Sequence, residues 1–296
     1  MNAKPDRSST WPLAWHQVVR EVLRWGKGIP GLWRLRHHVL NYERVRFPEK
    51  PVLTKLRYGP SMWVRPNDPI GRAIFYDGYW EPPIIEHFFR NLQSGDVVLD
   101  VGANIGQFTL VACKKVGPLG KVIAVEAGSS AWSLLRKNID ENSFTNVVPV
   151  HLAAWHEETT VYLDGVREDM LGWGTVSSAQ ADNKEAVPAS RLDSLLEKLA
   201  IEKVNVIKMD IEGAEMQALR GLVRTMEFTK PRLIYCELAN NHAEAASDPE
   251  EVMQFFAEYG YSGAILEDSG TTPLHAEIFT KPVNITAVFS QRGKAT

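Results

Sequence analysis

The stretch VVLDVGANIGQFT, residues 97–109, contains a buried strand, a glycine turn and the start of a helix. Its apolar run predicts a strand from Asp96 to Val101, and the residues after the turn predict a helix from Gln107 to Val116. Between them, Gly102 lets a ligand approach the backbone closely, and Gly106 permits tight packing of the helix against the strand. The stretch therefore predicts a strand–turn–helix unit of an α/β sheet, with a ligand at the turn.

After this unit, apolar strands and helical segments alternate along the chain, an order that implies parallel strands. The last two strands follow each other without a helix, which predicts an antiparallel pair. We therefore expect an α/β, Rossmann-like fold with a mostly parallel seven-stranded sheet and a C-terminal antiparallel strand pair. The expected strands are residues 96–101, 121–126, 147–154, 204–210, 232–237, 261–266 and 284–289. The expected helices are residues 82–91, 107–116, 129–142, 191–199, 212–226 and 250–259, and residues 164–189 are expected to form a loop.

The N-terminal part of the chain differs in composition from the rest. Residues 1–60 are rich in Trp, Arg and His, and we expect them to form a helical extension to a domain at residues 61–296. Residues 11–25 space Trp and Val side chains three and four positions apart, which predicts an amphipathic helix, and a second short helix is expected at residues 32–42. The first helix can pack on the main domain, form a dimer contact or touch a membrane surface.

Composition excludes several classes of protein. With a formal net charge of −3 over 296 residues and a pI of about 6.3, the chain as a whole lacks the basic footprint of a nucleic-acid-binding protein. Cys113 and Cys236 are too few for a disulfide framework or a zinc site. Residues 1–10 lack the apolar core of a signal peptide, and no apolar run approaches the ~20 residues that span a bilayer. We expect a cytoplasmic protein with no nucleic-acid partner.

The second strand ends at Glu126, and an acid at this position can accept both hydroxyls of an adenosine ribose. NAD requires G-x-G-x-x-G, whose middle glycine lets a pyrophosphate approach the helix N-terminus, and here Asn104 stands at that position. Asp100 adds a carboxylate that disfavours a pyrophosphate but suits the cationic amino-acid end of S-adenosylmethionine (SAM), directly or through water. The pattern favours SAM over NAD or a ligand-free turn. The expected cofactor-binding residues are Asp100, Gly102, Asn104, Gly106 and Glu126.

Several segments resemble the FkbM family of SAM-dependent methyltransferases, which have the class I methyltransferase fold. Besides the glycine turn, they are IGRAIFYDGYWEP at 70–82, RLDSL at 191–195, IKMDIEGAE at 207–215 and residues 231–237. The resemblance runs from about residue 69 to residue 289. Members of this family typically methylate hydroxyl oxygens of polyketides, sugars or glycolipids. The resemblance therefore implies an O-methyltransferase acting on such an acceptor.

Two carboxylates are expected at the carboxyl edge of the sheet, where an open α/β sheet binds its ligand. Asp210 ends the fourth expected strand and Glu237 ends the fifth. They can act as a general base, or they can share a divalent cation that lowers the pKa of the acceptor hydroxyl. A Mg²⁺ site at these two residues is an analogy with catechol O-methyltransferase-like enzymes. His242, in the following loop, is a further candidate for the base.

Each of these carboxylates also has a structural interpretation. Asp210 can cap the following helix, and Glu212 can be no more than a favourable charge near the N-terminus of that helix. Glu237 can form a buried ion pair with Lys208 or Arg232. These alternatives remain open in the sequence.

Two other functions compete with O-methylation. N-methyltransferases often carry an Asn/Asp-Pro-Pro-aromatic run after the fourth strand, whereas residues 210–213 read DIEG, which argues against an amine acceptor. A catalytically inactive methyltransferase-fold binding module is the second rival, and the intact acids at the sheet edge argue against it. The expected walls of the acceptor site are residues 164–189 and the extension 1–60.

Overall fold

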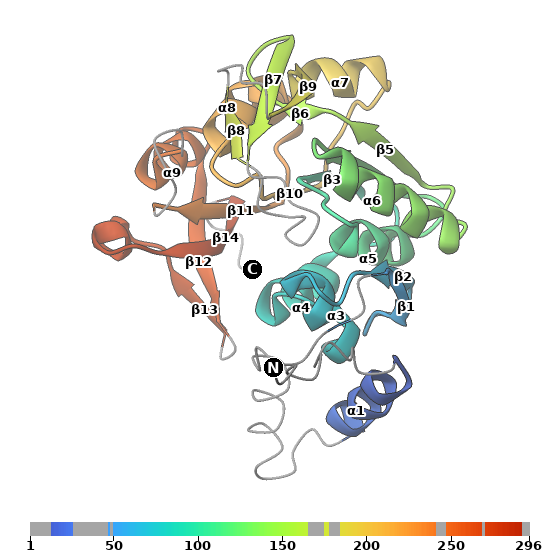
Figure 1. Ribbon diagram of the computed structural model, residues 1–296. Helices are drawn as coiled ribbons and strands as arrows, with labels where there is room; N and C mark the ends of the chain where they lie inside the picture. Colours follow the sequence, from blue (N-terminus) through green and yellow to red (C-terminus); the bar gives the residue numbers. More distant parts are fainter. Residues whose placement is uncertain are drawn as a thin grey trace, which may run out of the picture. The chain divides into compact units, whose positions relative to one another are not determined.

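The computed structural model forms two compact units, residues 1–80 and residues 81–296 (Figure 1). The domain boundary expected at residue 60 remains a prediction. The structure describes residues 13–25, 47, 50–164, 175–177, 184–240, 247–267 and 270–291. The second helix expected in the extension, residues 32–42, lies outside these ranges.

The first unit contains a helix, a short antiparallel hairpin and a second helix. Its elements are α1 (Leu13–Trp25), β1 (Val52–Lys55), β2 (Ser61–Val64) and α3 (Pro69–Asp77). The sequence did not predict α3. This helix begins because the Asp68 carboxylate accepts a hydrogen bond from the Gly71 backbone N–H at 2.7 Å and proline follows Asp68, and it ends at Gly78 in the left-handed conformation.

Helix α1 packs on α3 through a polar and aromatic flank. His16 Nδ1 lies 2.7 Å from the Tyr76 hydroxyl in a hydrogen bond, and the Arg20 guanidinium lies 5.1 Å from the centre of the Phe75 ring. Val18 and Val22, which belong to the expected apolar face, are 63% and 47% exposed. A dimer or membrane contact through this face remains a prediction. In the described part of the chain, no helix has the length and apolarity that a bilayer crossing requires.

The second unit is built on an eight-stranded sheet in the order β13-β12-β14-β11-β10-β3-β4-β5. The strands are β3 (Val97–Val101), β4 (Lys121–Glu126), β5 (Val147–His151), β10 (Val206–Met209), β11 (Leu233–Ala239), β12 (Tyr261–Glu267), β13 (Gly270–Pro273) and β14 (Asn284–Gln291). Strands β5, β4, β3, β10 and β11 are parallel, whereas β14 is antiparallel to both β11 and β12. The parallel strands follow the 3-2-1-4-5 order of doubly wound folds. The Rossmann-like prediction is confirmed.

The expected count of seven strands was wrong, because β13 folds back on β12 as an eighth strand. Its sequence, GTTP, is exposed along its whole length, so no alternation of apolar residues marks it. The described residues between β13 and β14 also include a short 3₁₀ helix, Ala276–Thr280.

A second sheet of four strands, in the order β6-β9-β7-β8, lies in the segment after β5. Its strands are β6 (Ala153–Ala154), β7 (Thr159–Asp164), β8 (Thr175–Ser177) and β9 (Glu185–Ser190). The expected single strand 147–154 is therefore divided, because Ala153 and Ala154 pair with β9 rather than with β4. The expected loop 164–189 contains β8 and most of β9. In β9, Val187 and Ala189 are buried, but a proline between them obscured the strand pattern.

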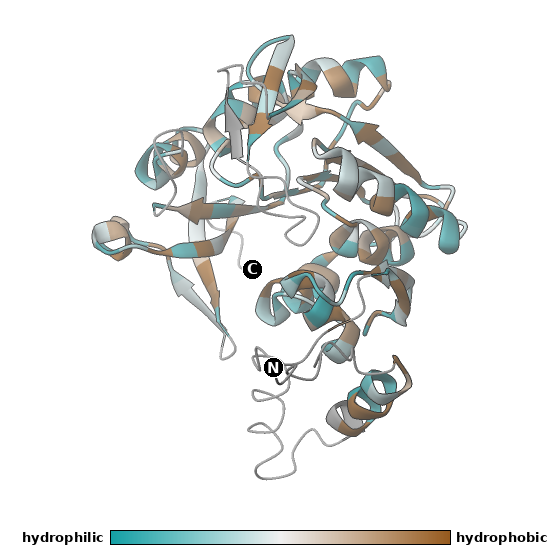
Figure 2. Ribbon diagram, in the orientation of Figure 1, coloured by the Kyte–Doolittle hydropathy of each residue, from teal (hydrophilic) through white to brown (hydrophobic). Residues whose placement is uncertain are grey.

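Helices cover the two faces of the main sheet with different chemistry. The helices are α4 (Pro82–Asn91), α5 (Gln107–Val116), α6 (Ser129–Glu141), α7 (Leu192–Lys198), α8 (Glu215–Arg220) and α9 (Pro249–Glu258). Apolar residues of α7, α8 and α9 form one large core with the central strands. On the opposite face, the Phe88 ring of α4 lies 5.3 Å from both Phe108 of α5 and Tyr235 of β11. In Figure 2 the central strands are largely brown, the colour of hydrophobic residues. The outer turns of the helices carry teal, the colour of hydrophilic residues.

The helix expected at residues 212–226 is shorter than predicted. Helix α8 ends at Arg220, and a separate π-helical turn follows at Thr225–Thr229. The Asp193 carboxylate, from the start of α7, accepts hydrogen bonds from the backbone N–H groups of Arg224 (2.8 Å) and Thr225 (3.0 Å). This contact starts the new turn, so Asp193 of the RLDSL motif has a structural role.

We predict that Gly102→Ala destabilises the second unit more than Gly95→Ala does. Both glycines have a positive φ, so each substitution costs about 1–2 kcal/mol. A Cβ at Gly102 would also lie 1.8 Å from the Asp210 carbonyl oxygen, whereas one at Gly95 would meet nothing within 4 Å. We expect an additional loss of about 1–3 kcal/mol for Gly102→Ala, measured by urea unfolding. Equal losses would show that this contact is not tight.

Candidate functional site

The glycine turn after β3 is pressed against the end of β10. Gly102 has φ 75°, and an added Cβ there would overlap the Asp210 carbonyl oxygen. The Asp210 backbone N–H donates to the Val101 carbonyl at 3.0 Å, which continues the parallel pairing of β3 with β10 into the turn. The strand order reverses between these two strands, and doubly wound sheets bind their ligands at such a switch point.

Glu126, at the carboxyl end of β4, faces this turn and is held by two backbone donors. Its Oε2 accepts from the Asn104 N–H and its Oε1 from the Gly128 N–H, both at 2.7 Å. Burial raises the pKa of Glu126 to about 7, although the two hydrogen bonds oppose that shift. A carboxylate oxygen has two lone pairs, so each oxygen keeps one for a ligand hydroxyl.

Asn104 adopts the conformation of the glycine that it replaces. Its φ is 49°, in the left-handed region that Asn tolerates better than most residues. Its side-chain oxygen accepts a hydrogen bond from the Ile105 N–H at 2.7 Å, which fixes the turn. Gly106 approaches α6, because an added Cβ would lie 2.7 Å from Leu135 Cδ1. The expected close packing at Gly106 is thus against a helix rather than a strand.

Asp100 lies beneath the turn and is only 1% exposed. The Thr109 hydroxyl donates to its Oδ2 at 2.5 Å. Burial raises the pKa of Asp100, and the charge of Lys208 acts in the opposite direction. Because the carboxylate is covered, its expected contact with a cofactor remains a prediction.

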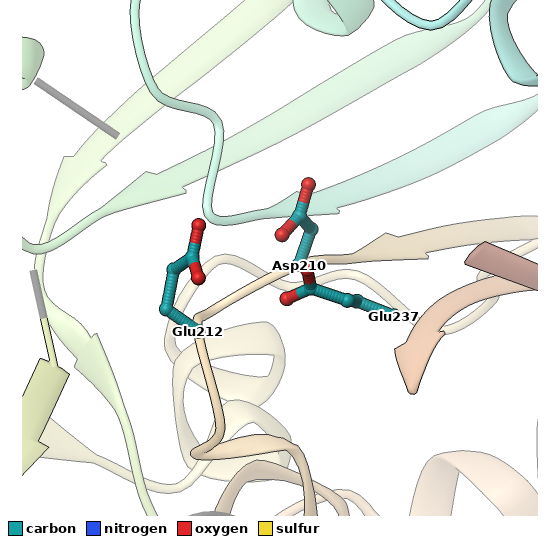
Figure 3. A group of neighbouring side chains, drawn as sticks. All are labelled: Asp210, Glu212 and Glu237. Atoms are coloured by element: carbon teal, nitrogen blue, oxygen red, sulfur yellow. The ribbon is translucent and has the colours of Figure 1, made fainter. Parts of the chain in front are cut away.

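Three carboxylates meet at the ends of the two central strands. Asp210 follows β10, Glu212 lies in the turn after it, and Glu237 lies in β11 (Figure 3). One oxygen of each lies within 4.8 Å of the others. Asp210 and Glu237 were expected to be neighbours, because β10 and β11 pair in parallel. Glu237 does not end its strand, however, since β11 continues to Ala239.

Alternation along β10 explains the buried cation beside this cluster. Ile207 and Met209 point into the core of α7–α9, so Lys208 points to the face of α4 and α5. Lys208 is 3% exposed, and its Nζ lies 2.6 Å from Asp210 Oδ2 and 4.9 Å from the centre of the Phe108 ring. Burial alone would lower the pKa of Lys208, but the surrounding carboxylates raise it above its ordinary value. The ammonium group is therefore charged.

These contacts decide between the structural alternatives for the acids. Lys208 pairs with Asp210, and Arg232 pairs with Asp96 at 2.7 Å, so neither of these ion pairs includes Glu237. Helix α8 has no side-chain cap from Asp210. Glu215 has that structural role, because its Oε1 accepts from the Ile211 and Gly213 N–H groups at 3.1 and 3.3 Å.

Burial and the mutual repulsion of these acids raise their pKa values. Burial, followed by the charges of Asp210 and Glu212, raises the pKa of Glu237 to about 11. Burial, followed by the charge of Asp210, also raises the pKa values of Glu212 and Glu81 to about 7. At neutral pH without a bound cation, Glu237 is thus protonated, while the ion pair with Lys208 favours the charged form of Asp210.

Sequence reasoning missed two members of this environment. A charge near a helix N-terminus is one interpretation of Glu212 in the sequence, but the turn brings its carboxylate to Asp210. Glu81, at the start of α4, contributes charge to Lys208 and Asp210, and its Oε2 is buried without a hydrogen-bond partner in the described residues. Alternation along β10 could have placed Lys208 beside Asp210. No local pattern could have placed Glu81.

The loop after β11 supplies no confirmed base. His242 lies outside the described residues. Asn240, its neighbour in the loop, is used in a structural clamp: its amide donates to the carbonyls of Phe279 (2.7 Å) and Lys281 (2.9 Å), and its oxygen accepts from the Val283 N–H (2.7 Å).

The model of the methyltransferase FkbM domain matches residues 100–262, more than half of the chain. The chain belongs to the FkbM methyltransferase family. This match covers the glycine turn, the second sheet and all three clustered carboxylates.

Two distant curated relatives have methyltransferase names. Hexuronic acid methyltransferase AglP of Haloferax volcanii is 24% identical over 60% of this chain and 68% of its own length. Methyltransferase 1 of Beauveria bassiana is 26% identical over 42% of this chain and 57% of its own length. The chain thus spans about three fifths of these relatives. Among solved structures, M. jannaschii TYW2 in complex with AdoMet is 16% identical, over 83% of this chain and 89% of that chain, with a TM-score of 0.41. That value is too low to support the fold, which rests on strand order.

We predict that the free energy of unfolding falls as pH rises, and that Glu237→Gln flattens the fall. The pKa of Glu237 is higher in the folded than in the unfolded chain, where it is near 4.5. Its stabilising contribution is therefore complete below about pH 4.5 and is lost progressively above it. The slope is at most about 1.4 kcal/mol per pH unit for this one proton. Urea unfolding with EDTA between pH 6 and pH 9 measures it.

Glu202→Gln is the matched control, because it makes the same chemical change at an exposed position away from the cluster. Parallel pH profiles for wild type and Glu237→Gln would show that Glu237 is ionised in the folded chain.

Proposed function

We propose that this protein transfers a methyl group from SAM to a hydroxyl of a sugar or a related polyol, glycolipid or polyketide-type acceptor. The observation that carries the proposal is the contact of Gly102 with Asp210. This contact places the glycine turn, where we propose that the cofactor binds, next to the carboxylates, where we propose that the acceptor binds. Both therefore lie at one edge of the sheet.

The residues of the turn fit SAM by their chemistry. Glu126 offers two fixed carboxylate oxygens to a ribose, and Asn104 keeps the turn open without the glycine that a pyrophosphate needs. Next to Glu126, His151 Nε2 lies 2.9 Å from the Ala127 carbonyl, and its ring stacks on Trp132. This pair contacts the segment that follows Glu126. SAM supplies an electrophilic methyl group when it is bound.

The acceptor must be oriented and lose a proton during transfer. Asp210, charged beside Lys208, can accept a hydrogen bond from the acceptor hydroxyl, and protonated Glu237 can donate one. A carboxylate is a weak base for an alcohol, so Asp210 acts by positioning and by taking the proton as transfer proceeds. A divalent cation such as Mg²⁺ at these residues would lower the pKa of the hydroxyl and make this step easier. His242 remains a second candidate for the base.

A sugar-type acceptor is supported by the name of the Haloferax relative, a hexuronic acid methyltransferase. An amine acceptor is less favoured because residues 210–213 lack the Pro-Pro-aromatic run of many N-methyltransferases. An inactive scaffold is less favoured because the acids at the switch point are present and clustered. The cytoplasmic location and the absence of a nucleic-acid partner remain predictions.

We predict that Glu126→Gln weakens binding of SAM and of its product S-adenosylhomocysteine about tenfold or more, because it removes a charged hydrogen-bond acceptor for the ribose. Isothermal titration calorimetry of the full chain measures this. Glu202→Gln, an exposed change of equal charge, should leave the affinity unchanged. Failure of the wild type to bind either compound would overturn the assignment of the cofactor.

We predict that Asp210→Asn binds S-adenosylhomocysteine nearly normally but loses methyl transfer by about a hundredfold or more. The assay follows S-adenosylhomocysteine formation with a panel of hexuronic acids, hexoses, glycolipids and amino sugars. A thermal melt checks that loss of the partner of Lys208 has not unfolded the variant. Normal turnover by Asp210→Asn would exclude Asp210 from the reaction, and methylation of amines alone would exclude a hydroxyl acceptor.

A further inference from the structure

We propose that Asp210, Glu212 and Glu237 together bind one divalent cation of the Mg²⁺ or Mn²⁺ type, and that Glu212 is a direct ligand. The role of this cation in activating an acceptor hydroxyl rests on the proposed methyl transfer. The site itself rests on the arrangement of the three side chains.

The spacing of the ligand atoms suits one ion. The three oxygens lie within 4.8 Å of one another, and Figure 3 shows the carboxylates of Asp210 and Glu212 side by side with that of Glu237 close to Asp210. Oxygens on opposite sides of an ion lie about 4.2 Å apart around Mg²⁺ and about 4.8 Å apart around Ca²⁺, twice the usual bond lengths. The larger of these separations matches the 4.8 Å limit, so a Mg²⁺-sized ion needs the oxygens to move slightly closer together.

Glu237 provides an independent indication that the cluster takes a ligand. It is 7% exposed and its side chain shares a hydrogen bond with Asp210, yet its Oε2 is buried with no hydrogen-bond partner in the described part of the chain. The residue lies inside β11, which is buried along its whole length. A buried carboxylate oxygen without a donor is unfavourable, and a cation between it and Asp210 would remove that cost.

The charges also favour a divalent ion. Three ionised carboxylates carry three negative charges, and the ammonium of Lys208 on Asp210 Oδ2 balances one of them. Two negative charges remain, which a divalent cation neutralises. The field of Glu81 makes the site more negative still.

The ligand set selects among cations. All three ligands are carboxylate oxygens, and neither His nor Cys belongs to the cluster in the described residues. Oxygen-only sites suit hard cations such as Mg²⁺, Mn²⁺ and Ca²⁺, whereas Zn²⁺ sites usually include nitrogen or sulfur. The three carboxylates leave positions for water or for an acceptor hydroxyl.

The turn after β10 fixes Glu212 in this set. Glu212 and Gly213 both have positive φ values, 53° and 97°, and this reverses the chain at once after Asp210. Glu215 holds that reversal through its hydrogen bonds to two backbone N–H groups. The conformation directs Glu212 back toward the strand end instead of along α8.

The test is titration of the full chain with Mn²⁺, without SAM, followed by the loss of the electron paramagnetic resonance signal of free Mn²⁺. We expect one Mn²⁺ per chain, displaced by Mg²⁺. Glu212→Gln and Glu237→Gln should each weaken Mn²⁺ binding about tenfold or more, because each removes a charged ligand. Glu202→Gln, with the same loss of charge at an exposed position away from the cluster, should bind as the wild type does.

Thermal melts check that each variant is folded. Glu212 lies in a partly exposed turn, so Glu212→Gln is the variant that should perturb the core least. No saturable Mn²⁺ binding by the wild type at millimolar concentration, with or without S-adenosylhomocysteine, would overturn the inference. So would wild-type affinity in Glu212→Gln. Binding of S-adenosylhomocysteine without Mn²⁺ would leave the proposed methyl transfer intact, whereas Mn²⁺ binding without S-adenosylhomocysteine would support the site and defeat the proposed function.

Discussion

The contact between the Gly102 backbone and the Asp210 carbonyl is the constraint from which the site is built. It extends the parallel pairing of β3 and β10 beyond the last residue of each strand. The glycine turn and the acid turn are thereby held together at the point where the strand order reverses. Glu126 on one side and Glu237 on the other come from the next strands in the sheet, so the sheet spacing sets the width of the site.

The positive charge of buried Lys208 lowers the energetic cost of placing several carboxylates close together. An isolated ammonium or carboxylate is costly to bury, but each lowers the cost of the other when they are paired. Lys208 reaches Asp210 because both follow the alternation of β10 on the face covered by α4 and α5. The remaining acids are only partly compensated, and this imbalance raises the pKa values of Glu237 and Glu212.

Much of the architecture could be read from local patterns. The helix expected at Gln107–Val116 and the strand at Lys121–Glu126 have the predicted bounds, because apolar period and glycine turns are strong there. The edge strand β13 and the proline-containing β9 were missed because neither shows a continuous alternation. The helix after β10 was overextended because Asp193, distant in sequence, starts a new turn at Arg224. Tertiary hydrogen bonds decided these cases.

The sequence determined the strand–turn–helix unit, the family resemblance and the choice of Asp210 and Glu237 as candidate acids, because these depend on residues that are neighbours in the chain. The tertiary structure decided which acids meet. Glu212 joins them through a turn with two positive φ values. Lys208 forms its ion pair with Asp210 rather than with Glu237, and Asp100 is covered by α5. Such choices depend on distances across the sheet and on solvent exclusion, and neither quantity is encoded in the spacing of residues along one segment.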